Sequence, residues 1–206
     1  MKLQISFDLA NLDQCIEIAE KVVQYADILE VGSSLVLKEG IKAVEIFKKQ
    51  FPQKEIFADI KLVDRIDGTI KNYADAGASY VTILAGTSNA IIQEASQLAH
   101  SRNIKIALDL VDSYSIGQSA MDAKALDIDL IIFHGPYESS RVTEILEEWQ
   151  SVRGNTNLPI YIAGGINKTN IDKILSFKPQ GIIIGEAITK SDNPTKEAEF
   201  FKSLLK

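Results

Sequence analysis

Short apolar runs rich in β-branched residues alternate with helix-length amphipathic segments along the whole chain. Such runs are typical of buried strands, and the segments between them have the apolar spacing of helices packed on one face. Dividing 206 residues among eight units gives about 26 residues for each strand and helix. Asn11 and Ser88 are predicted N-caps. The predicted strands are residues 3–8, 27–32, 55–60, 79–84, 104–110, 130–134, 159–164 and 181–186.

This strict alternation constrains the topology. Consecutive strands joined by helices form a parallel sheet with right-handed crossovers. Eight such units predict an α/β protein with a closed (β/α)8 TIM barrel, a single domain over residues 1–206 at the short end of the size range of that fold. A doubly wound open sheet is the alternative, but it predicts a glycine-rich turn after the first strand. The segment "SFDLANLD" contains no glycine, so we favour the barrel.

Composition excludes several classes of protein. With 22 basic and 28 acidic side chains the net charge is −6, and no basic stripe marks a nucleic-acid surface. No apolar run approaches the length of a membrane span, and acidic and polar residues occur too early for a signal peptide. Cys15 is the single cysteine, which excludes a disulfide framework. We expect a soluble cytoplasmic protein with no nucleic-acid or membrane partner.

Ionisable residues stand at the ends of several predicted strands, where an apolar core would not place them. In (β/α)8 barrels the chemistry lies at the carboxyl ends of the strands. Any one of these residues could be a cap or loop residue, and for an isolated aspartate that explanation is the better one. Together they predict an active site on one rim of the barrel. The residues are Asp8, Glu30, Asp59, Lys61, Asp109 and His134.

Glycines follow the seventh and eighth predicted strands. Gly164 and Gly165 lie in "AGGI" (163–166), and Gly185 lies in "IGEAIT" (184–189). In barrels these two loops commonly bind phosphate through backbone N–H groups, and glycine lets the backbone approach an anion closely. The alternative is that these glycines only turn the chain.

With its residues in this order, the chain resembles the orotidine-monophosphate decarboxylase superfamily. Within it, the chain is most similar to the branch of 3-hexulose-6-phosphate synthases and 3-keto-L-gulonate-6-phosphate decarboxylases. The matching segments are "FDLA", "ILEVG", "ADIKLVD", "AGGI" and "GEAIT". The D-x-K-x-x-D signature is Asp59, Lys61 and Asp64. The resemblance implies that these three form one charge network, in a homodimer where Asp64 is contributed to the partner's site.

Three positions favour the synthases over the decarboxylases. Asp109 stands where the decarboxylases tend to have Glu, and Tyr137, three residues after His134, stands where they have Arg. The eighth strand also lacks the arginine that grips phosphate in the decarboxylases. The chain departs from its relatives at Arg65 and Asp67 after the signature, and at Glu186, where synthases have Gly. Lys168 and Lys190 are candidates to offset that carboxylate near a phosphate.

The resemblance also implies a mechanism. Glu30 and Asp59 would hold Mg²⁺, or Mn²⁺, as hard oxygen ligands. Lys61 would stabilise negative charge as ribulose 5-phosphate loses its C1 proton, with His134 as proton shuttle. The enediolate carbon would then attack formaldehyde. The remaining residues would orient Lys61 or bind substrate: Asp8, Asp64, Asp109, Tyr137, Gly164, Gly165, Gly185 and Glu186.

Two alternatives remain open from the sequence. One is a 3-keto-L-gulonate-6-phosphate decarboxylase that uses the same enediolate intermediate. The other is a sugar-phosphate-binding barrel that has kept the fold and lost turnover, which Glu186 and Arg65 would support.

Overall fold

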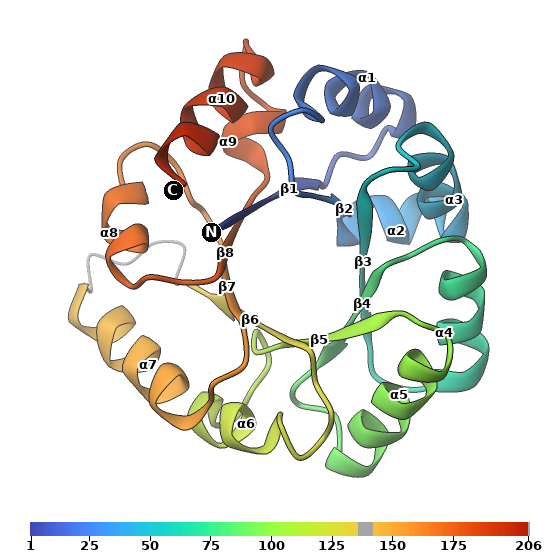
Figure 1. The fold of residues 1–206 in the computed structure, drawn as a ribbon, viewed down its shortest axis with the longest axis vertical. Coiled ribbons are helices and arrows are strands. Elements are labelled where there is room, and N and C mark those ends of the chain that lie inside the picture. The colour runs from blue at the N-terminus through green and yellow to red at the C-terminus, as the bar shows by residue number, and fades with distance from the viewer. Residues whose placement is uncertain (136–141, 206) are drawn as a thin grey trace.

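The computed structural model describes residues 1–135 and 142–205. The strands close into a parallel barrel in sequence order, with β8 paired to β1. Figure 1 shows the helices arranged in a ring around this barrel, as the alternation predicts for a (β/α)8 fold. The strands are β1 (Lys2–Phe7), β2 (Ile28–Val31), β3 (Glu55–Leu62), β4 (Tyr80–Leu84), β5 (Lys105–Asp109), β6 (Leu130–His134), β7 (Ile160–Ala163) and β8 (Gly181–Ile184).

The helices follow the strands with two additions to the simple alternation. The segment between β2 and β3 contains two helices that meet at Gly40, whose φ of 62° ends the first of them. A short helix, α9, also precedes the last helix of the chain. The described helices are α1 (Leu12–Val22), α2 (Ser33–Glu39), α3 (Ile41–Gln50), α4 (Ile66–Asp75), α5 (Asn89–Ser101), α6 (Ile116–Asp122), α7 (Val142–Asn155), α8 (Ile171–Ser176), α9 (Glu186–Thr189) and α10 (Pro194–Leu204).

Alternate strand residues enter two different layers, because successive side chains of a strand point to opposite faces. On β1, Leu3, Ile5 and Phe7 are fully buried in the layer between the sheet and the helices. Gln4 and Ser6 face the barrel interior, where they pair in register with Ile28 and Glu30 of β2. The apolar part of that interior is filled by Ile28, Phe57, Tyr80, Ala107, Leu130, Ile132, Tyr161, Ala163 and Ile183.

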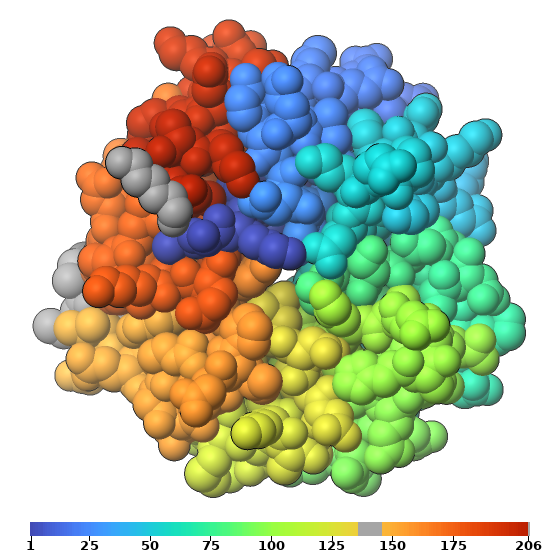
Figure 2. Space-filling view, in the orientation of Figure 1, coloured from blue at the N-terminus to red at the C-terminus, as the bar shows by residue number. Residues whose placement is uncertain are grey.

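The two ends of the barrel differ in character. Figure 2 shows the N-terminal residues, in dark blue, reaching across the middle of the end where β1 begins. The polar interior residues Ser6 and Glu30 come late in their strands, so they lie toward the opposite, carboxyl end. Within the described segments, no helix is both long and apolar enough to cross a bilayer.

Some predicted boundaries need correction. The side chain of Asn11 caps α1 by accepting the Gln14 N–H at 2.9 Å, as predicted. Ser88 precedes α5 but its side chain makes no capping hydrogen bond. Strand β8 ends at Ile184 and not at residue 186, because Gly185, with φ −105° and ψ −96°, leaves the extended conformation and α9 begins.

Candidate active site

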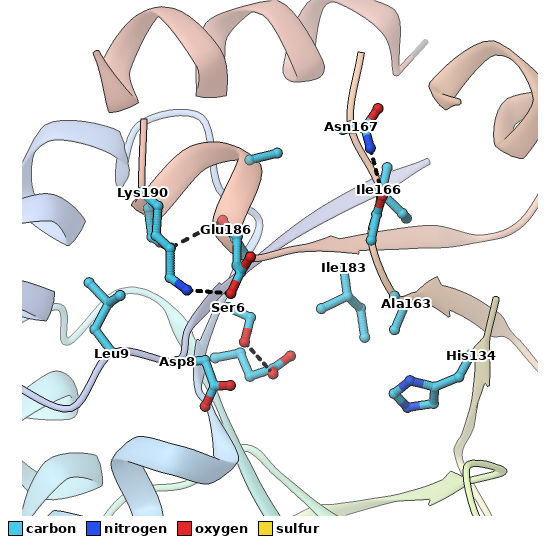
Figure 3. Close-up of a pocket in the computed structure, with 16 residues that line it drawn as sticks. Ser6, Asp8, Leu9, His134, Ala163, Ile166, Asn167, Ile183, Glu186 and Lys190 are labelled. Atoms are coloured by element: carbon cyan, nitrogen blue, oxygen red, sulfur yellow. Dashed lines mark hydrogen bonds and ion pairs between the residues drawn. The ribbon is translucent and has the colours of Figure 1, made fainter. Parts of the chain in front are cut away.

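A cavity of about 640 Å³ opens at the carboxyl end of the strands. Figure 3 shows Asp8, Glu186 and Lys190 on one wall and His134 on the other, with its ring directed into the space between them. Three of the strand-end residues predicted from the sequence, Asp8, Glu30 and His134, therefore line one cavity. The residues that line the cavity include Ser6, Asp8, Glu30, His134, Gly164, Gly165, Asn167, Gly185, Glu186 and Lys190.

Lys61 forms the centre of a buried ion-pair network beside this cavity. Its Nζ lies 2.8 Å from Asp109 Oδ2 and 3.1 Å from Asp59. Only 1% of the Asp109 side chain is exposed, so this carboxylate depends on its partners for compensation. Burial opposes the charged form of Lys61, but the two carboxylates outweigh it and raise the pKa of the ammonium group. Lys61 is thus held as a cation.

The backbone at Lys61 has an unusual conformation that directs this side chain. Its φ is 46°, in the left-handed region, and the register between β3 and β4 shifts between Ala58 and Leu62. Such an irregularity bends a strand and redirects a side chain. Thr82 of β4 stabilises it by accepting the Lys61 N–H at 2.8 Å and donating to Asp59 Oδ1 at 2.9 Å. Sequence reasoning missed Thr82, because a threonine within a strand carries no distinct signal.

Asp109 connects Lys61 to His134. His134 Nε2 lies 2.9 Å from Asp109 Oδ1. The ring is turned so that, among the described residues, neither of its nitrogens has a well-directed hydrogen-bond partner. Burial alone would raise the pKa of Asp109, but His134 and Lys61 together lower it, so this carboxylate is an anion between the two side chains. The His134 ring lines the cavity.

Glu30 is a carboxylate inside the barrel. Gln4 Nε2 and Ser6 Oγ donate to its two oxygens, the latter at 2.6 Å. Burial, and then the negative charge of Asp59, raise the pKa of Glu30 to about 7, although the two hydrogen bonds act in the opposite direction. Gln4 and Ser6 were not predicted as site residues. Their signal was present, since residues 4, 6 and 8 of the first strand are all polar and share one face.

The donor set fits a small divalent cation. Burial and the charge of Asp59 raise the pKa of Glu30, and burial raises the pKa of Asp59. Glu30 and Asp59 therefore repel each other in a place where water cannot screen their charges. A cation between Glu30 and Asp59 would relieve that repulsion. Over residues 1–135 and 142–205, no group of three or more His, Cys, Asp or Glu is arranged as a complete metal cage. Mg²⁺ commonly uses one or two carboxylates and takes its other ligands from substrate and water.

The predicted glycine loops form another part of the cavity wall. Gly164 and Gly165 have φ values of 100° and 55°. A residue with a side chain would be strained in this backbone conformation. The side-chain amides of Asn167 and Asn170 donate to the Gly165 carbonyl at 3.0 and 2.9 Å and fix this turn. Gly185 also lines the cavity. The turn at Gly164 and Gly165 therefore has a backbone conformation that favours glycine and is held by hydrogen bonds.

Of the remaining predicted residues, some line the cavity and others lie elsewhere. Asp8 lines the cavity, and its Oδ1 accepts the Ser34 N–H at 2.7 Å at the start of α2. Asp64 is exposed and, in the part of the chain that the structure describes, makes no ion pair with Lys61. Asp109, and not Asp64, therefore completes the network of Lys61 within one chain. Asp64 lies in a separate surface pocket with Arg65 and Asp67. Tyr137 lies outside the described residues.

Comparison with known proteins agrees with this geometry. The model of the orotidine 5'-phosphate decarboxylase / HUMPS family matches residues 1–201. A 3-hexulose-6-phosphate synthase of Bacillus subtilis (strain 168) is 32% identical over 207 residues, which cover 100% of this chain and 99% of that protein.

Solved structures show the same relationship. A 3-hexulose-6-phosphate synthase from Salmonella typhimurium has a TM-score of 0.90 at 26% identity, covering 100% of this chain and 98% of that one. A 3-keto-L-gulonate-6-phosphate decarboxylase from Vibrio cholerae shares the fold with a TM-score of 0.86 at 24% identity, covering 98% and 95%. From its sequence match and its barrel, the chain belongs to the orotidine 5'-phosphate decarboxylase / HUMPS family.

Proposed function

We propose that this protein is a carbon–carbon lyase of the 3-hexulose-6-phosphate synthase type, which joins formaldehyde to ribulose 5-phosphate through an enediolate. The observation that carries the proposal is the continuous chain of contacts from Asp59 through Lys61 and Asp109 to His134, which lines the cavity. These contacts join the Lys61 cation to an imidazole on the cavity wall. The similarity to named synthases over the full chain supports the choice of reaction.

Each step needs a group that the site contains. Loss of the C1 proton leaves negative charge on the substrate oxygens, and the Lys61 ammonium is held where it can stabilise that charge. His134 accepts the proton, since a neutral imidazole is a suitable base near neutral pH. The C1 carbon of the enediolate then forms a bond to the formaldehyde carbon. The resulting alkoxide takes up one proton, which balances the one removed.

Mg²⁺, with Mn²⁺ as a substitute, is the cofactor that we assign to Glu30 and Asp59. When bound, such an ion stabilises negative charge on substrate oxygens as a Lewis acid. Gln4 and Ser6 hold the Glu30 carboxylate in place, and Thr82 holds that of Asp59. These neighbours keep the two candidate ligands oriented before the ion arrives.

The substrate itself is held at both ends of the cavity in this proposal. The loops of Gly164, Gly165 and Gly185 would bind the phosphate through backbone N–H groups. Asp8 and Asp109 would contact the sugar hydroxyl groups. We further propose a homodimer in which Asp64 reaches the partner's Lys61, since Asp64 is exposed and unpaired with Lys61 in its own chain. We also assign substrate binding to Tyr137, and this assignment rests on the family pattern of His followed by Tyr three residues later.

Two assays test the proposal. The purified protein with Mg²⁺, ribulose 5-phosphate and formaldehyde is expected to form a hexulose 6-phosphate. In D₂O without formaldehyde it is expected to exchange the C1 proton of ribulose 5-phosphate. Release of CO₂ from 3-keto-L-gulonate 6-phosphate without formaldehyde fixation would identify a decarboxylase. Thermal stabilisation by ribulose 5-phosphate with no exchange would identify a binding protein and overturn the enzyme assignment.

A further inference from the structure

Glu186 and Lys190 form an ion pair on the cavity wall. They lie one turn apart, Glu186 at the start of α9 and Lys190 directly after it. Lys190 Nζ contacts Glu186 Oε1, and the two side chains are 54% and 75% exposed. Figure 3 shows both beside Ser6 and Asp8, across the cavity from His134. The pair is therefore accessible to a molecule that enters the cavity.

The charges around this pair are unevenly distributed. Of the described residues that line the cavity, Lys190 is the only lysine or arginine. Three carboxylates, those of Asp8, Glu30 and Glu186, also line the cavity. An anionic ligand group near Gly185 thus finds one exposed cation and one exposed carboxylate within reach. The cation is already paired with that carboxylate, so ligand and Glu186 compete for it.

We infer that Lys190 receives the anionic end of the substrate and that Glu186 is an internal competitor for it, which sets how tightly a phosphate is held. The inference rests on the proposed function for the identity of the substrate, but the competition itself requires only an anion. In the free protein Glu186 occupies Lys190. When a phosphate binds, Lys190 turns to the phosphate oxygens and Glu186 moves into solvent.

A second lysine–glutamate pair provides a matched control. Lys168 Nζ lies 2.6 Å from Glu197 Oε1 and 5.0 Å from the centre of the Phe200 ring. Lys168 was the other candidate to offset Glu186, but neither it nor Glu197 lines the cavity. This pair packs between the β7–α8 loop and α10 instead. Neutralising Glu197 removes the same charge from the protein without releasing Lys190.

The experiment is calorimetric titration of the full chain with inorganic phosphate at pH 8. Glu186→Gln is expected to bind phosphate about three- to fivefold more tightly, the scale of an exposed ion pair, and Lys190→Met about fivefold more weakly. In the Lys190→Met background the gain from Glu186→Gln is expected to shrink below about twofold, because no cation remains to be released. Glu197→Gln is expected to bind like the unmodified protein.

Other outcomes overturn the inference. Unchanged affinity in Glu186→Gln would remove the competition, and an equal gain in both backgrounds would show simple repulsion without it. An equal gain in Glu197→Gln would show an effect of net charge alone. The C1 proton exchange of ribulose 5-phosphate separates this result from the proposed function. Exchange with an unresponsive phosphate affinity sinks only the competition, whereas the expected affinities without exchange sink only the reaction.

Discussion

The hydroxyl of Thr82 accepts the backbone N–H of Lys61 at 2.8 Å, where β3 and β4 shift register. Through the same oxygen it donates to Asp59 Oδ1 at 2.9 Å. One side chain on β4 therefore holds both the left-handed backbone that directs Lys61 and a carboxylate that pairs with its ammonium group. Thr82 acts through these two residues, which makes it a positioning residue.

Thr82→Val is expected to lower the free energy of unfolding by about 1–3 kcal/mol, since it leaves the Lys61 N–H without a partner and removes one of the hydrogen bonds to the Asp59 carboxylate. It is also expected to lower kcat more than it raises KM, because it misdirects Lys61 rather than removing a substrate contact. Urea denaturation and steady-state kinetics measure both effects. Thr82→Ser, which keeps the hydroxyl, should restore most of each. A valine variant with unchanged stability and kcat would contradict the positioning role.

Lys61→Ala is expected to reduce turnover by at least about a thousandfold, because the cation that faces developing negative charge is lost. The secondary structure is expected to persist, since Lys61 is not one of the residues that form the apolar core. Circular dichroism and the formaldehyde assay provide the readouts. Lys71→Ala removes a lysine from an exposed pair with Asp75 and serves as the control. Substantial activity in Lys61→Ala would rule out the mechanism.

Glu30 makes stability depend on pH. Its pKa is raised from 4.5 to about 7, so the folded state binds this proton more tightly than the unfolded state. The stabilisation is complete below about pH 4.5 and is lost as the pH rises through 7. In metal-free buffer, the unmodified protein is expected to lose on the order of 3 kcal/mol relative to Glu30→Gln between pH 4.5 and 8. If the difference in free energy of unfolding between the unmodified protein and Glu30→Gln were the same at all pH values, the raised pKa would be contradicted.

Mg²⁺ or Mn²⁺ is expected to raise the melting temperature more at pH 8 than at pH 6, because in the proposed site the ionised form of Glu30 would be the ligand. At a hundredfold excess over Kd the stabilisation is about 2.7 kcal/mol. Scanning calorimetry with and without a chelator measures it. Glu30→Gln should abolish the shift, and Asp75→Asn, an exposed acid paired with Lys71, should not. Activity and stability indifferent to chelation would remove Glu30 and Asp59 from the ligand role.

The proposed sharing of Asp64 has a test in mixed dimers. Lys61→Ala and Asp64→Ala are each expected to be inactive alone. Unfolding and refolding them together should produce heterodimers in which one of two sites has both native residues. Random pairing then restores about a quarter of the unmodified activity. No recovery, or an active Asp64→Ala protein, would mean that Asp64 does not serve the partner's site.

The repeat of strands and helices in the sequence determines much of this fold without information from the tertiary structure. Eight βα units permit few topologies, and the absence of a glycine-rich turn after the first strand favoured the closed barrel over a doubly wound sheet. The rule that chemistry lies at the carboxyl ends of strands then brought Asp8, Glu30 and His134 to one cavity. These inferences succeeded because they depend on periodicity and chain direction, which the sequence states directly.

Tertiary structure decided which side chains meet. The spacing of Asp59, Lys61 and Asp64 suggested one network, but the bend at Lys61 turns its ammonium toward Asp109 on β5 and leaves Asp64 outside. Such a contact depends on the register between strands. The same holds for Thr82, whose partners belong to a neighbouring strand. A single sequence specifies the direction of each strand, whereas hydrogen bonds across strands fix which atoms come within 3 Å of one another.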